Sequence, residues 1–205
     1  MMMMIALPTY AADNEIFITQ SGTTANIDLE QLGSSNIIGG LNAAAGSMTT
    51  LDLDGNAFTL DINQIGNTNK FLGDIWGDNV TAFFEFDGDS NTFTIQADPT
   101  NTYGIDNSNL NVDVTGSTNT FTLNQGTTAL AATLDLDWVI NGTGNTVVSN
   151  INYDGATNFM DIDGNSNTVN FTGSGYAGGY FYLDQTGNNM TFNVQQLSTQ
   201  DNDWL

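Results

Sequence analysis

The stretch that decides the fold runs from Phe58 to Asn69 and reads FTLDINQIGNTN. In it, Leu60 and Ile62 alternate with polar residues such as Asp61, and a period of two is typical of a strand with one buried face. Gly66 then begins a short polar segment, and alternation resumes after Asn69. We interpret the stretch as a strand, a corner that needs glycine, and the start of a second strand.

The same arrangement recurs along the chain. The spacing between glycines in this setting is repeatedly 11 residues, as from Gly55 to Gly66, Gly77 and Gly88, and Asn often stands three residues after the glycine. Short internal repeats are typical of solenoids. No segment keeps the helical period of 3.6 residues. The sequence therefore predicts an all-β fold with essentially no helix: a β-solenoid, or two facing sheets, built from strand–turn–strand rungs of about 22 residues.

The repeats define the expected organisation of the chain. Residues 13–199 are predicted to form the solenoid, with irregular loops near 39–47, 98–107 and 126–133. Residues 1–12 read either as a signal-like segment or as an apolar arm, and residues 200–205 form a tail that ends in Trp204-Leu205. Most of the prominent aromatic residues are expected to face inward, namely Phe83, Phe84, Phe86, Trp138 and Phe181, whereas Tyr180 and Tyr182 are candidates for an outer face or a loop.

The composition restricts the partners of this chain. It has 23 acidic residues, Lys70 as its single basic residue, no His and a net charge of −22. A nucleic-acid backbone or an anionic membrane surface needs basic residues, so neither is an expected partner. The absence of Cys excludes disulfides and thiol chemistry.

The same composition gives little support to catalysis. His and Cys, the commonest general base and the thiol nucleophile, are absent. Carboxylate pairs such as Asp161 and Asp163 could supply an acid and a base, as in glycosidases, but a solvated outer face explains them more simply. The sequence predicts a protein that is not an enzyme, and a polysaccharide-active enzyme is the least favoured alternative.

Calcium is the one cofactor for which the sequence offers candidate ligands. Asp52 and Asp54, and again Asp161 and Asp163, precede a glycine that is followed by Asn. Ca²⁺ prefers such hard oxygen ligands, although the spacing matches neither the EF-hand nor the nonapeptide calcium repeat. The alternatives are a specific site or diffuse screening of the acidic surface by cations.

A short motif at the corners resembles a known family. The phrase Q-x-G-x-x-N stands at Gln31–Asn36 and at Gln64–Asn69, and the phrase Q-x-G stands at Gln20–Gly22 and at Gln185–Gly187. It is similar to the curlin repeat of bacterial curli fibres. By this resemblance the residues of a structural ladder are Gln20, Gly22, Gln31, Gly33, Asn36, Gln64, Gly66, Asn69, Asn91, Asn119, Asn145, Asn167, Gln185 and Gly187.

The resemblance implies a function as well as a fold. It implies a secreted, self-associating subunit of an extracellular, amyloid-like fibre or matrix, whose partners are itself or other structural proteins. The chain departs from the family in its Phe-rich and Trp-rich core, its irregular loops and its interrupted Gln row, and these departures weaken the case for indefinite fibre growth. The alternatives are a structural or adhesive component of a phage virion, and a module that binds glycans or a cell surface.

Overall fold

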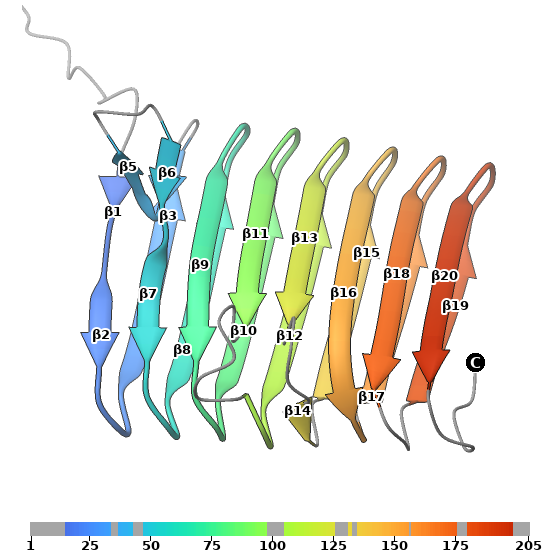
Figure 1. Ribbon diagram of the computed structural model, residues 1–205. Helices are drawn as coiled ribbons and strands as arrows, with labels where there is room; N and C mark the ends of the chain where they lie inside the picture. Colours follow the sequence, from blue (N-terminus) through green and yellow to red (C-terminus); the bar gives the residue numbers. More distant parts are fainter. Residues whose placement is uncertain are drawn as a thin grey trace, which may run out of the picture.

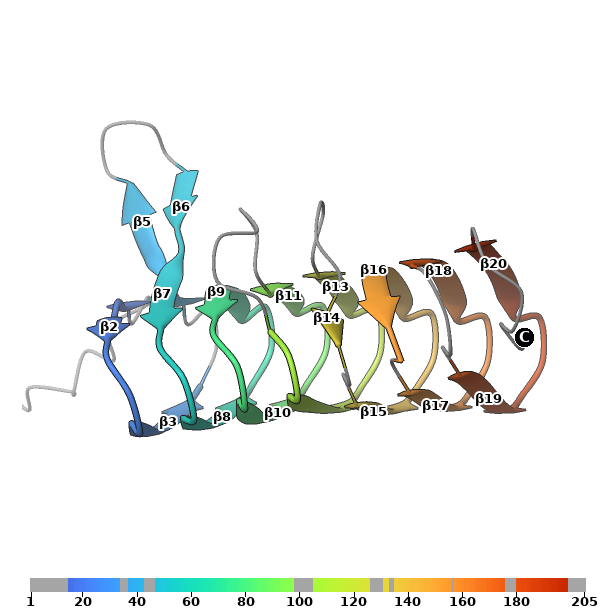
Figure 2. The ribbon, with the colours of Figure 1, turned by 60° about the horizontal axis from the view of Figure 1, so that its bottom comes forward.

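The computed structural model describes residues 15–33, 37–42, 47–97, 105–125, 131–132, 135–155, 157–175 and 180–198. In these residues the chain winds back and forth between two parallel sheets that face each other (Figures 1 and 2). One strand from each sheet makes a rung, and the rungs lie side by side in chain order from β1 to β20 (Figure 1). The predicted all-β solenoid is confirmed, and the described residues contain no helix.

The seven-stranded sheet has the simpler topology. Its order is β3-β8-β10-β12-β15-β17-β19, and every neighbouring pair is parallel and in register over seven residues. The strands are β3 (Asn26–Leu32), β8 (Thr59–Ile65), β10 (Thr81–Asp87), β12 (Asn109–Thr115), β15 (Asp135–Asn141), β17 (Thr157–Asp163) and β19 (Tyr180–Thr186).

The eleven-stranded sheet covers the other side of the core. Its strands are β1 (Glu15–Ile16), β2 (Thr19–Ser21), β4 (Ile37–Ile38), β7 (Leu51–Asp54), β9 (Lys70–Trp76), β11 (Thr92–Ala97), β13 (Thr120–Gln125), β14 (Ala131–Ala132), β16 (Thr146–Asp154), β18 (Thr168–Gly175) and β20 (Thr191–Ser198). Both β4 and β7 pair with β9, at its beginning and its end. They are therefore two halves of one interrupted strand.

The interruption is an antiparallel hairpin of β5 (Gly40–Asn42) and β6 (Ser47–Thr49), which projects from the eleven-stranded sheet (Figure 2). The coil is interrupted near residues 39–47 as predicted, but the described part of the insertion is a regular hairpin and not an irregular loop. The hairpin lengthens the first full turn of the coil, so that Gln31 and its neighbour Gln64 in the next rung are 33 residues apart, against 22 for Asn69 and Asn91. Insertions thus change the length of a rung without changing its register.

The core fills the space between the two sheets. Trp138, Phe86 and Phe93 are fully buried, and the rings of Phe86 and Phe93 stack with centroids 3.6 Å apart. Phe83 is an exception to the expected inward set, because its side chain is 46% exposed. The physical reason is the strand period: Phe84 and Phe86 share one face of β10, which places Phe83 on the other face.

Corner glycines stack on one another from rung to rung. Gly66, Gly88, Gly116, Gly142, Gly164 and Gly187 all have φ between +131° and +149°, in a region that side chains rarely adopt. A Cβ on Gly116 would overlap the carbonyl group of Gly88 in the preceding rung. The third residue of each corner instead takes a left-handed conformation that other residue types tolerate, as at Ser90 with φ of 60°.

A glycine exchange tests this difference between corner positions. We expect Gly116→Ala to lower the free energy of unfolding by on the order of 3 kcal/mol, because both the backbone conformation and the stacking contact forbid a Cβ. The matched control is Gly144→Ser, at the third position of the next corner in the stack. Its φ of 71° resembles that of Ser90 and Ser166, and we expect a loss below about 1 kcal/mol. Urea unfolding followed by circular dichroism measures both, and equal losses would contradict the stacking argument.

Candidate functional site

A row of buried Asn side chains connects the corners of successive rungs. It consists of Asn69, Asn91, Asn119, Asn145 and Asn167, each at most 2% exposed. The backbone N–H of each of the first four donates to Oδ1 of the next Asn along the row, at 2.7 to 2.9 Å. In return, Nδ2 of the last four donates to a corner-glycine carbonyl of the preceding rung, at 2.8 to 3.0 Å. The row therefore bonds the corners together in both directions along the stack.

The row changes at its two ends. At the C-terminal corner, Met190 stands in the position that Asn occupies in the earlier corners, and its sulfur approaches the position of a Cβ on Gly187. Asn36, which the motif assigns to the same row, lies outside the described residues. The described row thus belongs to the interior rungs of the solenoid.

The Gln residues of the motif fall into two different rows. Gln31 and Gln64 are neighbours in the seven-stranded sheet, both buried, and Nε2 of Gln64 donates to Oε1 of Gln31 at 2.7 Å. Gln20 lies in β2 of the other sheet, in register with Leu53. The row of Gln31 and Gln64 continues through Phe86, Val114, Ile140, Ile162 and Gln185. Amides therefore mark both ends of this row and apolar side chains fill its middle.

The glycines of the motif occupy the first position of their corners. Gly33, Gly66 and Gly187 belong to the stack on one side of the solenoid, whereas Gly22 begins the stack on the other side, followed by Gly55. The backbone N–H of Gly33 donates to the Ile65 carbonyl of the next rung at 2.9 Å. These contacts hold the backbone, and they leave no space for a ligand between corners.

The candidate calcium ligands do not come together. Asp52 and Asp54 lie in β7 of the eleven-stranded sheet, whereas Asp161 and Asp163 lie in β17 of the seven-stranded sheet. Both pairs point away from the core, so they are on opposite outer faces of the solenoid. Over the described residues, no group of three or more acidic, His or Cys side chains is placed to hold a metal ion. Calcium at either pair stays a prediction.

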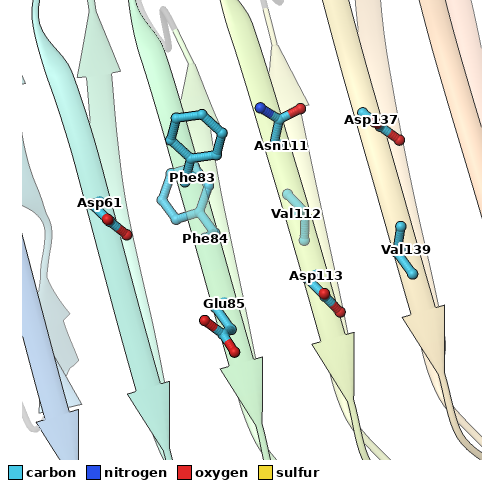
Figure 3. A pocket seen from close by; sticks show the side chains of 9 residues that line it. All are labelled: Asp61, Phe83, Phe84, Glu85, Asn111, Val112, Asp113, Asp137 and Val139. Atoms are coloured by element: carbon cyan, nitrogen blue, oxygen red, sulfur yellow. The ribbon is translucent and has the colours of Figure 1, made fainter.

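The seven-stranded sheet carries a groove on its outer face that sequence reasoning missed. One cavity of about 310 Å³ is lined by Asp61, Phe83, Phe84, Glu85, Asn111, Val112, Asp113, Asp137 and Val139 (Figure 3). A second, of about 420 Å³, is lined by Asp137, Val139, Phe159, Met160, Asp161, Tyr182 and Asp184. They share Asp137 and Val139, so together they form one groove across the strands, which we call the outer groove. The sequence feature that could have revealed the groove is that Phe83 and Phe159 stand at outward positions of their strands.

Two carboxyl groups on the outer faces have a raised pKa. Burial, and to a smaller extent the neighbouring Asp87 carboxylate, raise the pKa of Asp113 in the outer groove. Burial also raises the pKa of Asp74 on the other sheet, partly opposed by a hydrogen bond from Thr50 and reinforced by Asp52. In both places desolvation and like charge disfavour the ionised form.

Comparison with known protein families, curated proteins and solved structures finds no match to this chain. The resemblance to the curlin repeat consequently rests on the corner motif alone. None of the described segments forms a helix with the length and apolar character that a membrane span requires.

Removing one amide from the Asn row should destabilise the fold. Asn119→Ala leaves the Asn91 N–H and the Gly88 carbonyl without these partners inside the corner, and we expect a loss of about 2 to 4 kcal/mol in unfolding free energy. Asn150→Ala is the control, since its bond to Asn124 lies on the exposed face, and it should cost less than about 0.5 kcal/mol. Chemical denaturation of both variants checks this, and a control as damaging as Asn119→Ala would refute the argument.

The raised pKa of Asp113 and Asp74 predicts a stability that depends on pH. A carboxyl group whose pKa is higher in the folded state takes up its proton more readily there. Its stabilising contribution is present below the unfolded pKa and is lost as the pH rises through the folded pKa. We therefore expect the melting temperature to rise as the pH falls from about 7 toward about 4.

Asp113→Asn should raise the melting temperature at neutral pH and reduce its dependence on pH. The control is Asp163→Asn, which removes an equal charge from an exposed position of β17. Melting curves at several pH values in constant salt separate the two variants. An unchanged pH profile in Asp113→Asn would show that another group is responsible.

Proposed function

We propose that this chain is a non-catalytic structural protein, of curlin-like type, that self-associates end to end as a subunit of an extracellular fibre or matrix. The observation that supports the proposal is the incomplete burial of the side chains in the two terminal rungs. Their inward apolar side chains are only half-buried, although the equivalent side chains of interior rungs are fully buried.

One row through the seven-stranded sheet illustrates this difference. It runs through Leu29, Ile62, Phe84, Val112, Trp138, Met160 and Leu183. The five interior members are at most 2% exposed, whereas Leu29 and Leu183 are half-buried. The same holds in the other sheet for Ile18 at one end and Val194 at the other. Within the described residues, each end lacks the contacts that one more rung would supply, and burying this apolar surface favours association.

The backbone at each end is also suited to receive another rung. Within the described residues, β3 and β19 each pair with a neighbour on one side only. Because all strands of this sheet are parallel, a second copy displaced along the solenoid axis would place its β3 beside β19 in the same direction. Such head-to-tail contact uses two different surfaces and can repeat, which gives a filament.

The same displacement would extend the Gln row. Gln185 of one copy would meet Gln31 of the next, and Gln31 already accepts a hydrogen bond from Gln64. Gln185 is exposed at the end of the chain's own row. Stacked amides of this kind stabilise cross-β assemblies.

Charge opposes this association. With a net charge of −22, copies repel one another, and Asp184 would lie beside Glu30 of the next copy in the row that these two share. The proposal therefore expects assembly to depend on salt, which screens such repulsion within about 10 Å at 0.1 M.

A structural component of a virion is the second candidate. It is favoured by the unequal rungs, in which neighbouring residues of successive rungs are separated by 22, 23, 26, 28 or 33 residues. Such irregular rungs suit a bounded solenoid that docks one end on another structural protein. The two candidates differ in whether the chain forms filaments by itself.

The test uses the purified full chain at increasing salt, with light scattering and negative-stain electron microscopy. We expect unbranched filaments, and we expect Gln185→Glu to suppress them by placing a charge in the contact. Gln195→Glu adds the same charge on the outer face of β20 and should assemble normally. A protein that stays monomeric at high salt, or equal suppression by both variants, would overturn end-to-end association.

A proline exchange tests the same contact through the backbone. Gly33 donates its N–H toward β8, so the alternation of the strand turns the N–H of Glu30 toward the open edge of β3. Glu30→Pro removes that donor, and Glu30→Ala removes only the side chain. We expect filaments from the Ala variant and none from the Pro variant, with both monomers folded by circular dichroism; filaments from a folded Pro variant would contradict pairing through this edge.

A further inference from the structure

The outer groove has features that a self-associating solenoid does not need. Its two cavities lie on the outer face of the seven-stranded sheet, and the second extends to β19, the strand at one end of this sheet. They extend over β8, β10, β12, β15, β17 and β19, which at the usual strand spacing of about 4.8 Å is a length of roughly 24 Å. The groove therefore runs along the solenoid axis, across the strands.

Exposed aromatic rings line this groove. Phe83, Phe159 and Tyr182 are 46%, 41% and 46% exposed, and Tyr180 beside them is 45% exposed. The ring of Phe159 lies 5.7 Å from that of Tyr182 and 5.9 Å from that of Tyr180, measured between centroids. Packing across neighbouring strands explains why Phe159, Tyr180 and Tyr182 lie together. Nothing in the described part of the chain covers these rings. Large rings left open in a concave surface are typical of a binding surface.

Carboxylates alternate with the rings along the groove. Asp61, Glu85, Asp113 and Asp137 line the first cavity, in which Figure 3 shows Glu85 and Asp113 on neighbouring strands, and Asp161 and Asp184 line the second. The only basic residue of the chain, Lys70, belongs to β9 in the other sheet. A ligand of this groove must therefore supply the positive charge, and aromatic faces beside carboxylates attract ammonium and guanidinium groups.

The negative charge of the groove also excludes other classes of ligand. A second copy would bring the same acidic face and a single Lys, so two outer grooves repel each other. Nucleic acids and acidic glycans are anionic and are repelled as well. What remains complementary is a cationic chain long enough to follow the groove.

We propose that the outer groove binds an extended, lysine-rich or arginine-rich segment of a partner protein, laid along the solenoid axis. At about 3.3 Å per residue, roughly seven residues span the groove, and alternate side chains face it. Their cationic groups lie over Phe83 and over the pair of Phe159 and Tyr182, against the carboxylates between them. The side of the solenoid thus recruits a basic partner, independently of whether its ends associate.

The experiment measures binding of a fluorescein-labelled peptide with eight residues of alternating lysine and serine, by anisotropy, to the full chain at low salt. Phe159→Ser/Tyr182→Ser leaves the charge unchanged and should weaken binding by about tenfold. Asp137→Asn/Asp161→Asn should weaken it by about fivefold. All four side chains are on the surface of the groove, and circular dichroism verifies that the variants fold.

The matched control removes two charges from the opposite face. Asp52→Asn/Asp74→Asn should change the affinity by less than twofold, because these residues lie in β7 and β9. Equal weakening by the two charge variants, or unchanged binding in the ring variant, would reduce the effect to diffuse attraction by an acidic protein and overturn the proposal. So would binding of an uncharged glucose hexasaccharide with no binding of the peptide.

Discussion

The structure depends on the contact between corners of successive rungs. At the corners from Gly88 to Gly164, on one side of the solenoid, a glycine lies against the glycine carbonyl of the preceding rung, and an Asn bonds the two rungs through both atoms of its amide. This contact fixes the register of the following strands, because a shift by one residue would turn every inward side chain outward. The buried core between the sheets is a consequence of that register.

The corners also explain how the chain tolerates insertions. Rungs differ in length by as much as a complete hairpin, β5–β6, yet the strands on either side remain in register. The hairpin leaves the eleven-stranded sheet between β4 and β7, and both of these halves stay paired with β9. A fold that is held by contacts between rungs can thus vary its outer loops, whereas the stacked corners admit little change.

Two kinds of surface result from this architecture and they have different chemistry. In the described residues, the ends expose partly buried apolar side chains and strands that are paired on one side only, and these properties favour association of one end with the opposite end of another copy. The sides carry many of the acidic residues that the structure describes, and this charge of one sign repels a like surface. The two proposals follow from this division: copies meet at their ends, and a basic partner binds at the side.

The sequence by itself determined the strands, the corners and the inward faces, because a period of two and the conformational needs of glycine are local properties. The length of the repeat and the facing sheets followed from them. Only the tertiary structure decided which outward residues are neighbours. Because rungs vary in length from 22 to 33 residues, the sequence spacing does not reveal that Phe159 lies beside Tyr182. It also decided that Gln64 is buried and Gln185 exposed, because the same motif is covered by a further rung in one place and not in the other.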